Sequence, residues 1–359
     1  MGYATKTILK FGTALLFLQA FAAGATAQSV QKALDELAAK PAGERQAFLE
    51  EKAKQDGKIV VYAADDPNVM RAWEEAFHTK YPEIKVEYVR MSTKDMLQRV
   101  EAETAAGRPV ASLLGGITAS EINYLMERGM LASYHSPEAA GFPPSYADPD
   151  GKWTVHWLMP EVTAFNTDTI SKEDVPVDQE KLWGSDFKAP IGRLQSGGRW
   201  LAGYASLKGE EAAAKLADAV AAKKPQLFQS NSDLTNALTA GQIAVAADMH
   251  AGNVAIAADR GAPIDYVLPE PLPILPAYTV FLADAPNPYA AALNYDWRLA
   301  KDGGQSFYKE FHQFGPREDT EYDFADVATS GRTLVPLTDK VLATIGQYDT
   351  MFREKVLGK

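Results

Sequence analysis

The sequence contains 359 residues, with 36 Lys and Arg against 47 Asp and Glu, a formal net charge of -11. This length favours two domains, and the acidic balance argues against nucleic acid as a partner, because phosphate contacts require clustered Lys and Arg. The chain contains no cysteine, which excludes disulfides, thiolate metal sites and cysteine nucleophiles.

Residues 1–27 have the layout of a secretory signal peptide. Lys6 and Lys10 precede an apolar stretch at 11–23, and Ala25-Thr26-Ala27 offers a peptidase site before Gln28. The apolar stretch is shorter than the ~20 residues that a membrane span requires. We therefore predict that residues 1–27 are removed on export and that the protein is periplasmic. An anchoring helix is the alternative.

The following residues, 28–56, are predicted to form an N-terminal helical extension, because Val30, Leu34 and Leu37 recur with helical spacing. A first αβ region then begins at Gly57. It is predicted to alternate strands at 58–63, 84–89 and 110–114 with helices at 66–78, 93–106 and 119–127. This alternation, with short connections, predicts an α/β fold with a parallel sheet covered on both faces.

A long surface connection rich in Pro, Gly, Tyr and Asp is predicted at 135–153. Beyond it the sequence predicts a second αβ region, with strands at 154–165, 191–194, 243–247 and 278–282 and helices at 200–207, 210–222, 232–240, 288–301 and 305–311. The Pro-rich segment 269–276 is predicted to be a turn.

Candidate ligand-binding residues follow two strands of the first region. Ligands of open parallel sheets bind beyond the carboxyl ends of the strands. Those ends carry Asp65 and Asp66 after the first strand, and Gly115, Gly116 and Thr118 after the third. The alternative for the Asp pair is a cap of the helix that begins near Pro67.

A second candidate site is the turn Ser196-Gly197-Gly198-Arg199-Trp200, which joins a strand to a helix. Its glycines allow close backbone approach, a helix N-terminus favours an anion, and Arg199 adds a charge-assisted hydrogen bond. We therefore predict an anion-binding turn outside the core, with an ordinary turn and a solvent-facing Arg199 as the alternative. Trp157, Trp200 and Tyr278 are candidate walls of a ligand site, although large aromatic residues are more often core.

Five segments in a fixed order resemble the extracellular solute-binding proteins of ABC importers, in the branch that contains the periplasmic ferric-ion-binding proteins. They are KAKQDGKIVVYAADDPNVMRAWEEAFHTKYPEIKVEYVR, VASLLGGITASEINYLMERGML, VTAFNTD, GAPIDYVLPE and APNPYAAALNYDWRLAKDGGQSFYK. The resemblance implies the type II periplasmic-binding-protein fold, in which two αβ lobes are joined by hinge strands around a central ligand cleft. It implies crossings at 162–166 and 279–282, lobe 1 at 57–162 and 276–325, and lobe 2 at 163–275 and 326–359.

The same resemblance implies a function. Proteins of this kind capture a small ligand by hinge closure and deliver it to an ABC permease in the inner membrane. We expect a monomer that has no cofactor and is not an enzyme. The sequence has neither a G-x-S-x-G nucleophile elbow nor a phosphate loop ending in GK[ST], and its five His residues are scattered, so we predict no catalytic residues. A secreted hydrolase is one alternative.

The identity of the ligand depends on the positions that hold iron in the ferric branch. Those proteins use a His after the first strand, a Glu after the third, and a Tyr pair in the second lobe. The matching places here hold Asp66, Ile117 and the stretch Asp248-Met249-His250-Ala251-Gly252, which contains no Tyr. Phenolate oxygens select ferric iron in that family, so we expect a small carboxylate or phosphorylated solute and no resident metal. Asp248 and His250 remain candidate ligand-binding residues, and ferric-iron transport is the other alternative.

Overall fold

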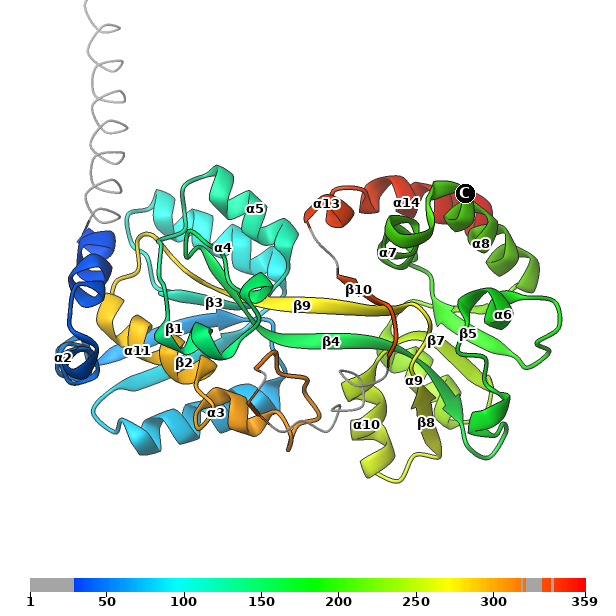
Figure 1. The fold of residues 1–359 in the computed structure, drawn as a ribbon, viewed down its shortest axis with the longest axis horizontal. Helices are drawn as coiled ribbons and strands as arrows, with labels where there is room; N and C mark the ends of the chain where they lie inside the picture. The colour runs from blue at the N-terminus through cyan, green and yellow to red at the C-terminus, as the bar shows by residue number, and fades with distance from the viewer. Residues whose placement is uncertain (1–28, 318, 321–330, 337–338) are drawn as a thin grey trace, which may run out of the picture. The chain divides into compact units, whose positions relative to one another are not determined.

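The computed structural model describes residues 29–317, 319–320, 331–336 and 339–359 (Figure 1). The predicted signal peptide at 1–27 and the predicted lobe boundary at 325/326 lie outside these residues. The chain divides into two compact units. Unit 1 takes its described residues from Met1–His156, Ala277–Phe307 and Pro316–Thr320, and unit 2 takes them from Trp157–Pro276, Tyr308–Gly315 and Glu321–Lys359.

Unit 1 is built on a sheet in which β1 is the central parallel strand. The strands are β1 (Lys58–Ala63), β2 (Lys85–Arg90), β3 (Leu113–Ile117) and the second half of β9 (Leu272–Phe281). β1 pairs in parallel with β2 and β3, and β3 pairs antiparallel with β9. The helices are α3 (Pro67–Lys80), α4 (Thr93–Ala105), α5 (Ala119–Glu127) and α11 (Pro288–Leu299). In Figure 1, α4 and α5 lie on one side of these strands and α3 lies on the other.

Two of the unit 1 helices begin with side-chain caps that the sequence explains. Asp66 accepts hydrogen bonds from the backbone N–H groups of Asn68 and Val69, at 2.8 and 3.4 Å, ahead of Pro67 in the first turn of α3. Thr118 and Glu121 form a capping box at the start of α5. These caps fix where the two strands that precede the helices end.

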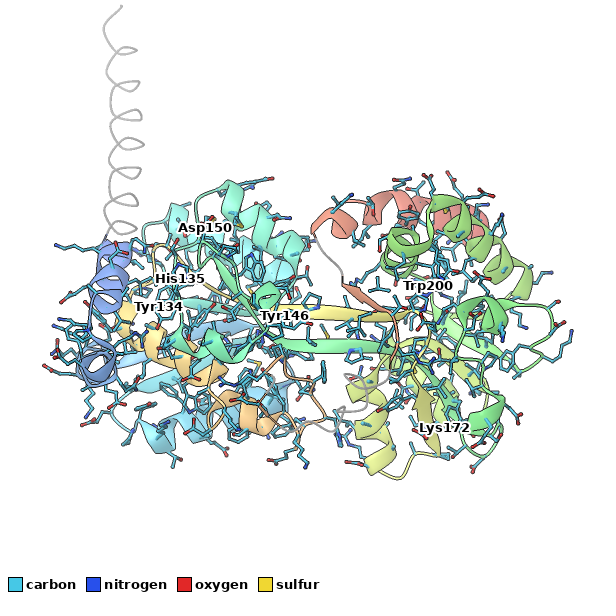
Figure 2. The ribbon with its side chains drawn as sticks, in the orientation of Figure 1. Tyr134, His135, Tyr146, Asp150, Lys172 and Trp200 are labelled. Carbon is cyan, nitrogen blue, oxygen red and sulfur yellow. The ribbon has the colours of Figure 1, made fainter. Side chains whose placement is uncertain are left out.

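Helical segments at 29–38 and α2 (Ala42–Asp56) precede β1; α2 packs on α11, and Glu36 of the first segment accepts a hydrogen bond from the Tyr289 hydroxyl at 2.9 Å. Asp56 accepts hydrogen bonds from the backbone N–H groups of Tyr289 and Ala290, at 2.8 and 2.9 Å, and so caps α11. Arg45 pairs with Asp296 at 2.9 Å, and both bond the hydroxyl group of Tyr134, which is labelled in Figure 2. The extension is therefore joined to unit 1 through polar contacts as well as apolar packing.

Unit 2 carries a mixed sheet. Its strands are the second part of β4 (Trp153–Asn166), β5 (Ile191–Leu194), β6 (Gln226–Phe228), β7 (Val245–His250), β8 (Ile264–Val267), the first half of β9, and β10 (Leu334–Pro336). β5 runs parallel to β6 and β7, and β4 runs antiparallel to β7 and β8. β4 and β9 are the two strands that pass from one unit into the other.

The helices of unit 2 include α6 (Gln179–Trp183), α7 (Gly198–Lys208), α8 (Glu210–Lys223), α9 (Asn231–Thr239), α10 (Ala251–Asp259), α13 (Asp339–Leu342) and α14 (Ile345–Phe352). One apolar core joins α6, α7, α8 and α14 to the sheet. Trp200 belongs to this core, is 5% exposed, and lies edge-on to Trp183 at 6.2 Å between ring centroids (Figure 2). No helix within the described ranges is both long and apolar enough to cross a membrane.

Several predicted boundaries differ from the structure. The helix predicted at 305–311 is a 3-10 helix at Gly304–Phe307 followed by turns. β3 lies three residues later than predicted, so Gly115 and Gly116 are strand residues. β7 extends to His250, so Asp248 and His250 also lie in a strand. The predicted turn at 269–276 is largely strand, because β9 begins at Leu272 and buries its apolar side chains while pairing with β10.

Candidate functional site

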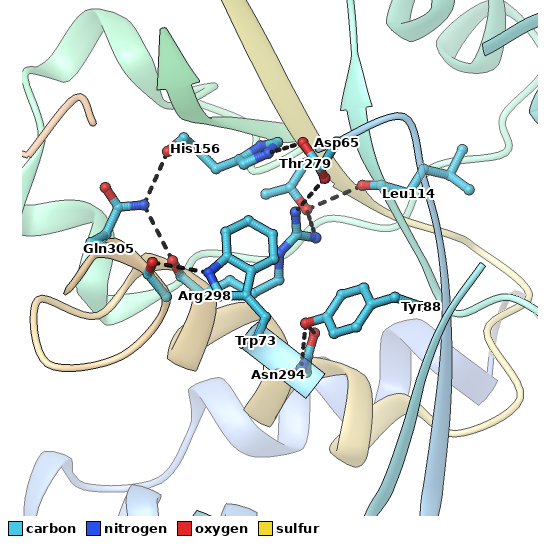
Figure 3. Close-up of polar contacts among 10 residues, drawn as sticks. Asp65, Trp73, Tyr88, Leu114, His156, Thr279, Asn294, Arg298 and Gln305 are labelled. Carbon is cyan, nitrogen blue, oxygen red and sulfur yellow. Dashed lines mark hydrogen bonds and ion pairs between the residues drawn. The ribbon is translucent and has the colours of Figure 1, made fainter. Parts of the chain in front are cut away.

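Asp65 lies in a buried network of unit 1 (Figure 3). Its Oδ1 atom is 3.0 Å from Nε2 of His156, and its Oδ2 atom is 3.3 Å from Nη2 of Arg298. The exposed fractions of these residues are 2% for Asp65 and 0% for His156 and Arg298. Burial lowers the pKa of His156, and the neighbouring Asp65 carboxylate partly offsets this effect. This placement corrects the expectation that the Asp65 carboxylate is open to a ligand.

The Arg298 side chain ties several elements of unit 1 together. Its Nη1 atom donates to Oγ1 of Thr279 at 3.2 Å, and that hydroxyl donates to the Leu114 carbonyl at 3.1 Å. The guanidinium lies 4.7 Å from the ring centroid of Trp73. Gln305 donates to the carbonyl groups of His156 and Arg298, at 3.0 and 3.2 Å. The network joins β1, β3, β4, β9 and α11, and we interpret its role as holding these elements together.

Gly115 and Gly116 make room for this network. A Cβ atom on Gly115 would come within 2.6 Å of Nη2 of Arg298, and one on Gly116, where φ is +69°, would come within 2.8 Å of the Asp65 backbone nitrogen. The glycines are thus explained by close packing. Asp66 and Thr118 cap helices, which is the alternative named for the Asp pair. Tyr278 is 7% exposed and packs edge-on against Trp153.

The predicted anion-binding turn of unit 2 is partly buried. Ser196 and Arg199 are exposed, whereas Gly197 and Gly198 are buried. The N–H of Gly198 donates to Oδ1 of Asp349 at 2.7 Å, and a Cβ atom on Gly197 would collide with the ring of Phe352. The expectation that the turn lies outside the core is therefore wrong for both glycines. A carboxylate of the chain itself already occupies this end of α7.

Arg193, on β5, is a buried charged residue that sequence reasoning missed. It is 0% exposed, and its Nη2 atom is 2.9 Å from Oδ2 of Asp248. Its guanidinium lies 4.6 Å from the ring centroid of Trp200 and 4.5 Å from that of Phe352. Burial raises the pKa of Asp248, and Arg193 opposes this shift. A lone charge within the apolar segment Ile191–Leu194 was the available signal.

Glu161, on β4, was also missed. It is 7% exposed and lies directly across the β4–β7 ladder from His250. Its Oε1 atom is 3.9 Å from Nη1 of Arg199, and no hydrogen bond reaches its carboxyl group from the part of the chain that the structure describes. Burial raises the pKa of Glu161 to about 7, with Asp248 adding to the shift and Arg199 opposing it. Glu161 is the single acid in the otherwise uncharged segment 157–165, which was the available signal.

His250, at the end of β7, is neutral at pH 7. Burial lowers the pKa of its imidazole to about 4, and the positive charge of Arg199 lowers it further. Its Nδ1 atom is buried and has no hydrogen-bond partner among the described residues. A neutral imidazole of this kind is able to donate to, or accept from, a bound ligand.

We call the residues Arg193, Asp248, Glu161, His250 and Arg199 the unit 2 cluster. Within it, Arg193 and Asp248 compensate each other. Arg199 is the exposed charge, with 47% of its side chain accessible, and its ion-pair partner among the described residues is Glu161 at 3.9 Å. Among the residues that the structure describes, no three His, Asp or Glu side chains come together as a metal-ligand set. The cluster therefore offers a ligand an exposed arginine, a neutral imidazole and a carboxyl group whose pKa is about 7.

Comparisons with known proteins rest on structure. No protein-family model matches the sequence, and no curated protein matches it. Among solved structures, iron-bound HitA from Pseudomonas aeruginosa superposes with a TM-score of 0.70 at 18% identity, over 83% of this chain and 99% of that one. The ferric binding protein from Campylobacter jejuni gives 0.69 at 18% identity, over 83% and 99%.

A third solved structure is the periplasmic binding protein AfuA from Actinobacillus pleuropneumoniae with fructose 6-phosphate bound. It gives a TM-score of 0.64 at 20% identity, over 84% of this chain and 99% of that one. Such identities establish a shared fold and leave the ligand open. The chain therefore has the α/β fold of the type II periplasmic binding proteins, as its sequence segments predicted.

Proposed function

We propose that the protein is the solute-binding component of an ABC importer and that it captures a small anionic solute, a carboxylate or a phosphorylated compound, in the periplasm. It binds this solute as a monomer without converting it and presents it to a permease in the inner membrane. The shared fold supports a binding role, and the unit 2 cluster supports an anion. The predicted signal peptide supports the location.

The single observation that carries the anion is the state of Arg199. At 3.9 Å its guanidinium is too far from Glu161 for a hydrogen bond, so its N–H groups remain for a ligand. The neighbouring His250 is neutral at pH 7, and Arg193 is already paired with Asp248. Positive charge therefore exceeds negative charge at this face whenever Glu161 is protonated. Arginine binds planar carboxylate and phosphate groups with two parallel hydrogen bonds.

Ferric iron is the second candidate, because HitA is an iron-bound relative in fold. Glu161, Asp248 and His250 are the donors that unit 2 would offer to a cation. Two arginines, Arg193 and Arg199, lie beside them and would repel a trivalent ion. The stretch 248–252 also lacks the tyrosine that phenolate ligation requires. These features favour the anion.

A thermal-shift screen tests the proposal. The full-length gene is expressed, and the exported protein is screened with pyruvate, malate, sulfate, fructose 6-phosphate, ferric citrate and the cation spermidine. A ligand at 100 times its Kd adds ~2.7 kcal/mol to the free energy of unfolding, which raises Tm by several degrees. We expect a rise with at least one iron-free anion and none with spermidine. A rise with ferric citrate alone, together with a visible charge-transfer band, would replace the anion by iron.

The location has its own measurement. Intact-mass spectrometry of the exported protein should show a chain that begins near Gln28, because the A-x-A site ends at Ala27.

A second measurement tests whether the protein is an enzyme. Chemical analysis of the ligand found in the screen, after incubation with the protein, should show that it is unchanged. Turnover of the hit would support the hydrolase alternative instead.

A further inference from the structure

We propose that Glu161 is a ligand-binding residue that acts in its protonated form: its carboxyl O–H donates a hydrogen bond to an oxygen atom of the anion that Arg199 binds. This inference rests on the proposed anion binding and adds to it a second ligand contact. It also predicts that anion binding is coupled to proton uptake. One proton passes from solvent to the Glu161 carboxylate as the anion binds.

The geometry of Glu161 carries the argument. Its side chain is buried on β4, at 7% exposure, yet no hydrogen bond from the described residues satisfies its carboxyl group. The Glu161 side chain keeps 9% of its surface accessible, so its carboxyl group is left to water or to a ligand. Arg199, at 3.9 Å, lies close enough for one small ligand to reach both side chains.

The charged groups around Glu161 come from three elements. β7 contributes Asp248 and His250, β5 contributes Arg193, and α7 contributes Arg199. Asp248 and Arg193 form an ion pair at 2.9 Å and largely cancel, and His250 is neutral. The ionised form of Glu161 is therefore supported mainly by Arg199.

An anion changes this balance. When it binds Arg199, it neutralises the cation that favours ionised Glu161 and adds a negative charge beside the carboxyl group. Both effects favour the protonated acid, whose pKa burial has already raised to about 7. The protonated acid then has an O–H donor that an anionic oxygen accepts.

The class of ligand follows from this pairing. The site requires a group with two or more acceptor oxygens, one set for Arg199 and one for the Glu161 O–H. Carboxylate, phosphate and sulfate groups meet that requirement, whereas an ammonium group offers only donors. A metal cation would have the opposite linkage, because it favours ionised Glu161 and releases a proton.

The test is isothermal titration calorimetry of the exported protein with sulfate, pyruvate and glucose 6-sulfate between pH 6 and 8.5. These probes keep their charge over this range, so the protein alone determines the pH dependence. With a pKa of about 7, the affinity should fall about tenfold from pH 6 to pH 8. Buffers of different ionisation enthalpy should show uptake approaching one proton at pH 8.

Two variants and a control assign the effect to Glu161. Glu161→Gln keeps a hydrogen-bond donor that does not titrate, so its affinity should stay within about threefold of the wild type at pH 6 and no longer change with pH. Glu161→Leu lacks the donor and should bind about tenfold more weakly at pH 6. Glu211→Gln, at an exposed position on α8, should keep the wild-type pH dependence.

The outcomes separate this inference from the proposed function. If the wild type binds none of the three probes at any pH, the proposed anion binding fails and the inference fails with it. If the wild type binds a probe with an affinity independent of pH, or with proton release, only the inference fails. The wild-type proton count decides the question even if a Glu161 variant does not fold.

Discussion

Both units contain an arginine that is 0% exposed and paired with an aspartate. Arg298 bonds Asp65 at 3.3 Å in unit 1, and Arg193 bonds Asp248 at 2.9 Å in unit 2. Each guanidinium also lies over aromatic rings. The pairs differ in what surrounds them. In unit 1, His156 bonds Asp65 and Thr279 bonds Arg298, whereas the unit 2 pair has Glu161, His250 and the exposed Arg199 near it.

This difference separates a structural ion pair from a site. The unit 1 pair bonds His156 and Thr279 and so ties β1, β4, β9 and α11 together, although Nε of Arg298 and Oε1 of Gln305 are buried without a hydrogen bond among the described residues. The unit 2 pair lies near Arg199, whose side chain is 47% exposed, so a ligand from solvent can reach a positive charge there. We therefore propose that the unit 1 network contributes to stability and that the unit 2 cluster binds the ligand.

The largest expected effect follows from removing the arginine of the unit 1 ion pair. Arg298→Met leaves the Asp65 carboxylate buried without its guanidinium, which should lower the free energy of unfolding by about 3–5 kcal/mol. Urea unfolding at pH 7 measures this loss. Adding Asp65→Asn in the same chain removes the uncompensated charge and should recover part of the stability. A loss below about 1 kcal/mol in Arg298→Met would contradict the structural assignment.

The complementary variant removes the exposed charge of unit 2. Arg199→Ala should weaken sulfate binding by roughly 1.5–3 kcal/mol, the range for a hydrogen bond to a charged group, with little change in Tm. Calorimetry and thermal unfolding measure the two quantities. Arg260→Ala, an exposed arginine that caps the C-terminus of α10, is the matched control and should bind as the wild type does. Equal affinity in both variants would move the site elsewhere.

The pH dependence of stability tests the cluster without a ligand. The Glu161 pKa rises from 4.5 to about 7, so its contribution to stability is largest below pH 4.5 and is lost as pH rises toward 7. The His250 pKa falls from 6.5 to about 4, so its contribution is complete above pH 6.5 and is lost as pH falls toward 4. The two contributions oppose each other between pH 4.5 and 6.5.

A variant that removes one of the two groups should therefore show how the other group alone changes the free energy of unfolding with pH. Relative to the wild type, the free energy of unfolding of Glu161→Gln should rise by about 2 kcal/mol between pH 4.5 and 6.5. The reason is that the variant lacks the loss of stability that ionisation of Glu161 causes in the wild type. His250→Asn should lose a similar amount over the same range. Urea unfolding at a series of pH values provides both difference curves. Parallel curves for wild type and Glu161→Gln would show that Glu161 titrates normally in the folded protein.

The smallest expected effect concerns the end of α7. Asp349→Ala removes the carboxylate that accepts from Gly198, which should cost about 0.5–2 kcal/mol of stability, as for other helix caps. Thermal unfolding measures the change, with Gln347→Ala on the same helix as the control. The freed N–H should also let sulfate bind more tightly if the turn belongs to the site. Unchanged sulfate affinity would confine the site to the unit 2 cluster.

Sequence patterns correctly predicted the helices and strands whose ends are set by residues close in the sequence. The strands at 58–63 and 191–194 and the helix at 119–127 match β1, β5 and α5. β3 was misplaced because its start is set by pairing Leu113 with Val61, across the sheet. The strand at Leu272 was missed because burial and pairing with β10 outweigh the low strand preference of proline.

The site was only partly predictable for the same reason. Arg199 was predicted as a candidate from a turn, and Asp248 and His250 from the resemblance to the ferric-ion-binding proteins; the structure places the three residues near Glu161. Glu161 and Arg193 lie inside apolar strands, where the pattern predicts core and conceals a charge. Asp65 is paired with residues 91 and 233 positions away, so no local pattern could show that its carboxylate is already bonded.

The cap that Asp56 provides has a consequence for how this protein is divided into parts. The carboxylate lies two residues before β1, yet it completes a helix that begins at Pro288. A shortened chain that starts at the first strand would keep every sheet residue and still leave the N-terminus of α11 uncapped. The helices before the sheet are therefore part of the folding unit, and a boundary drawn at the first strand divides one cooperative structure.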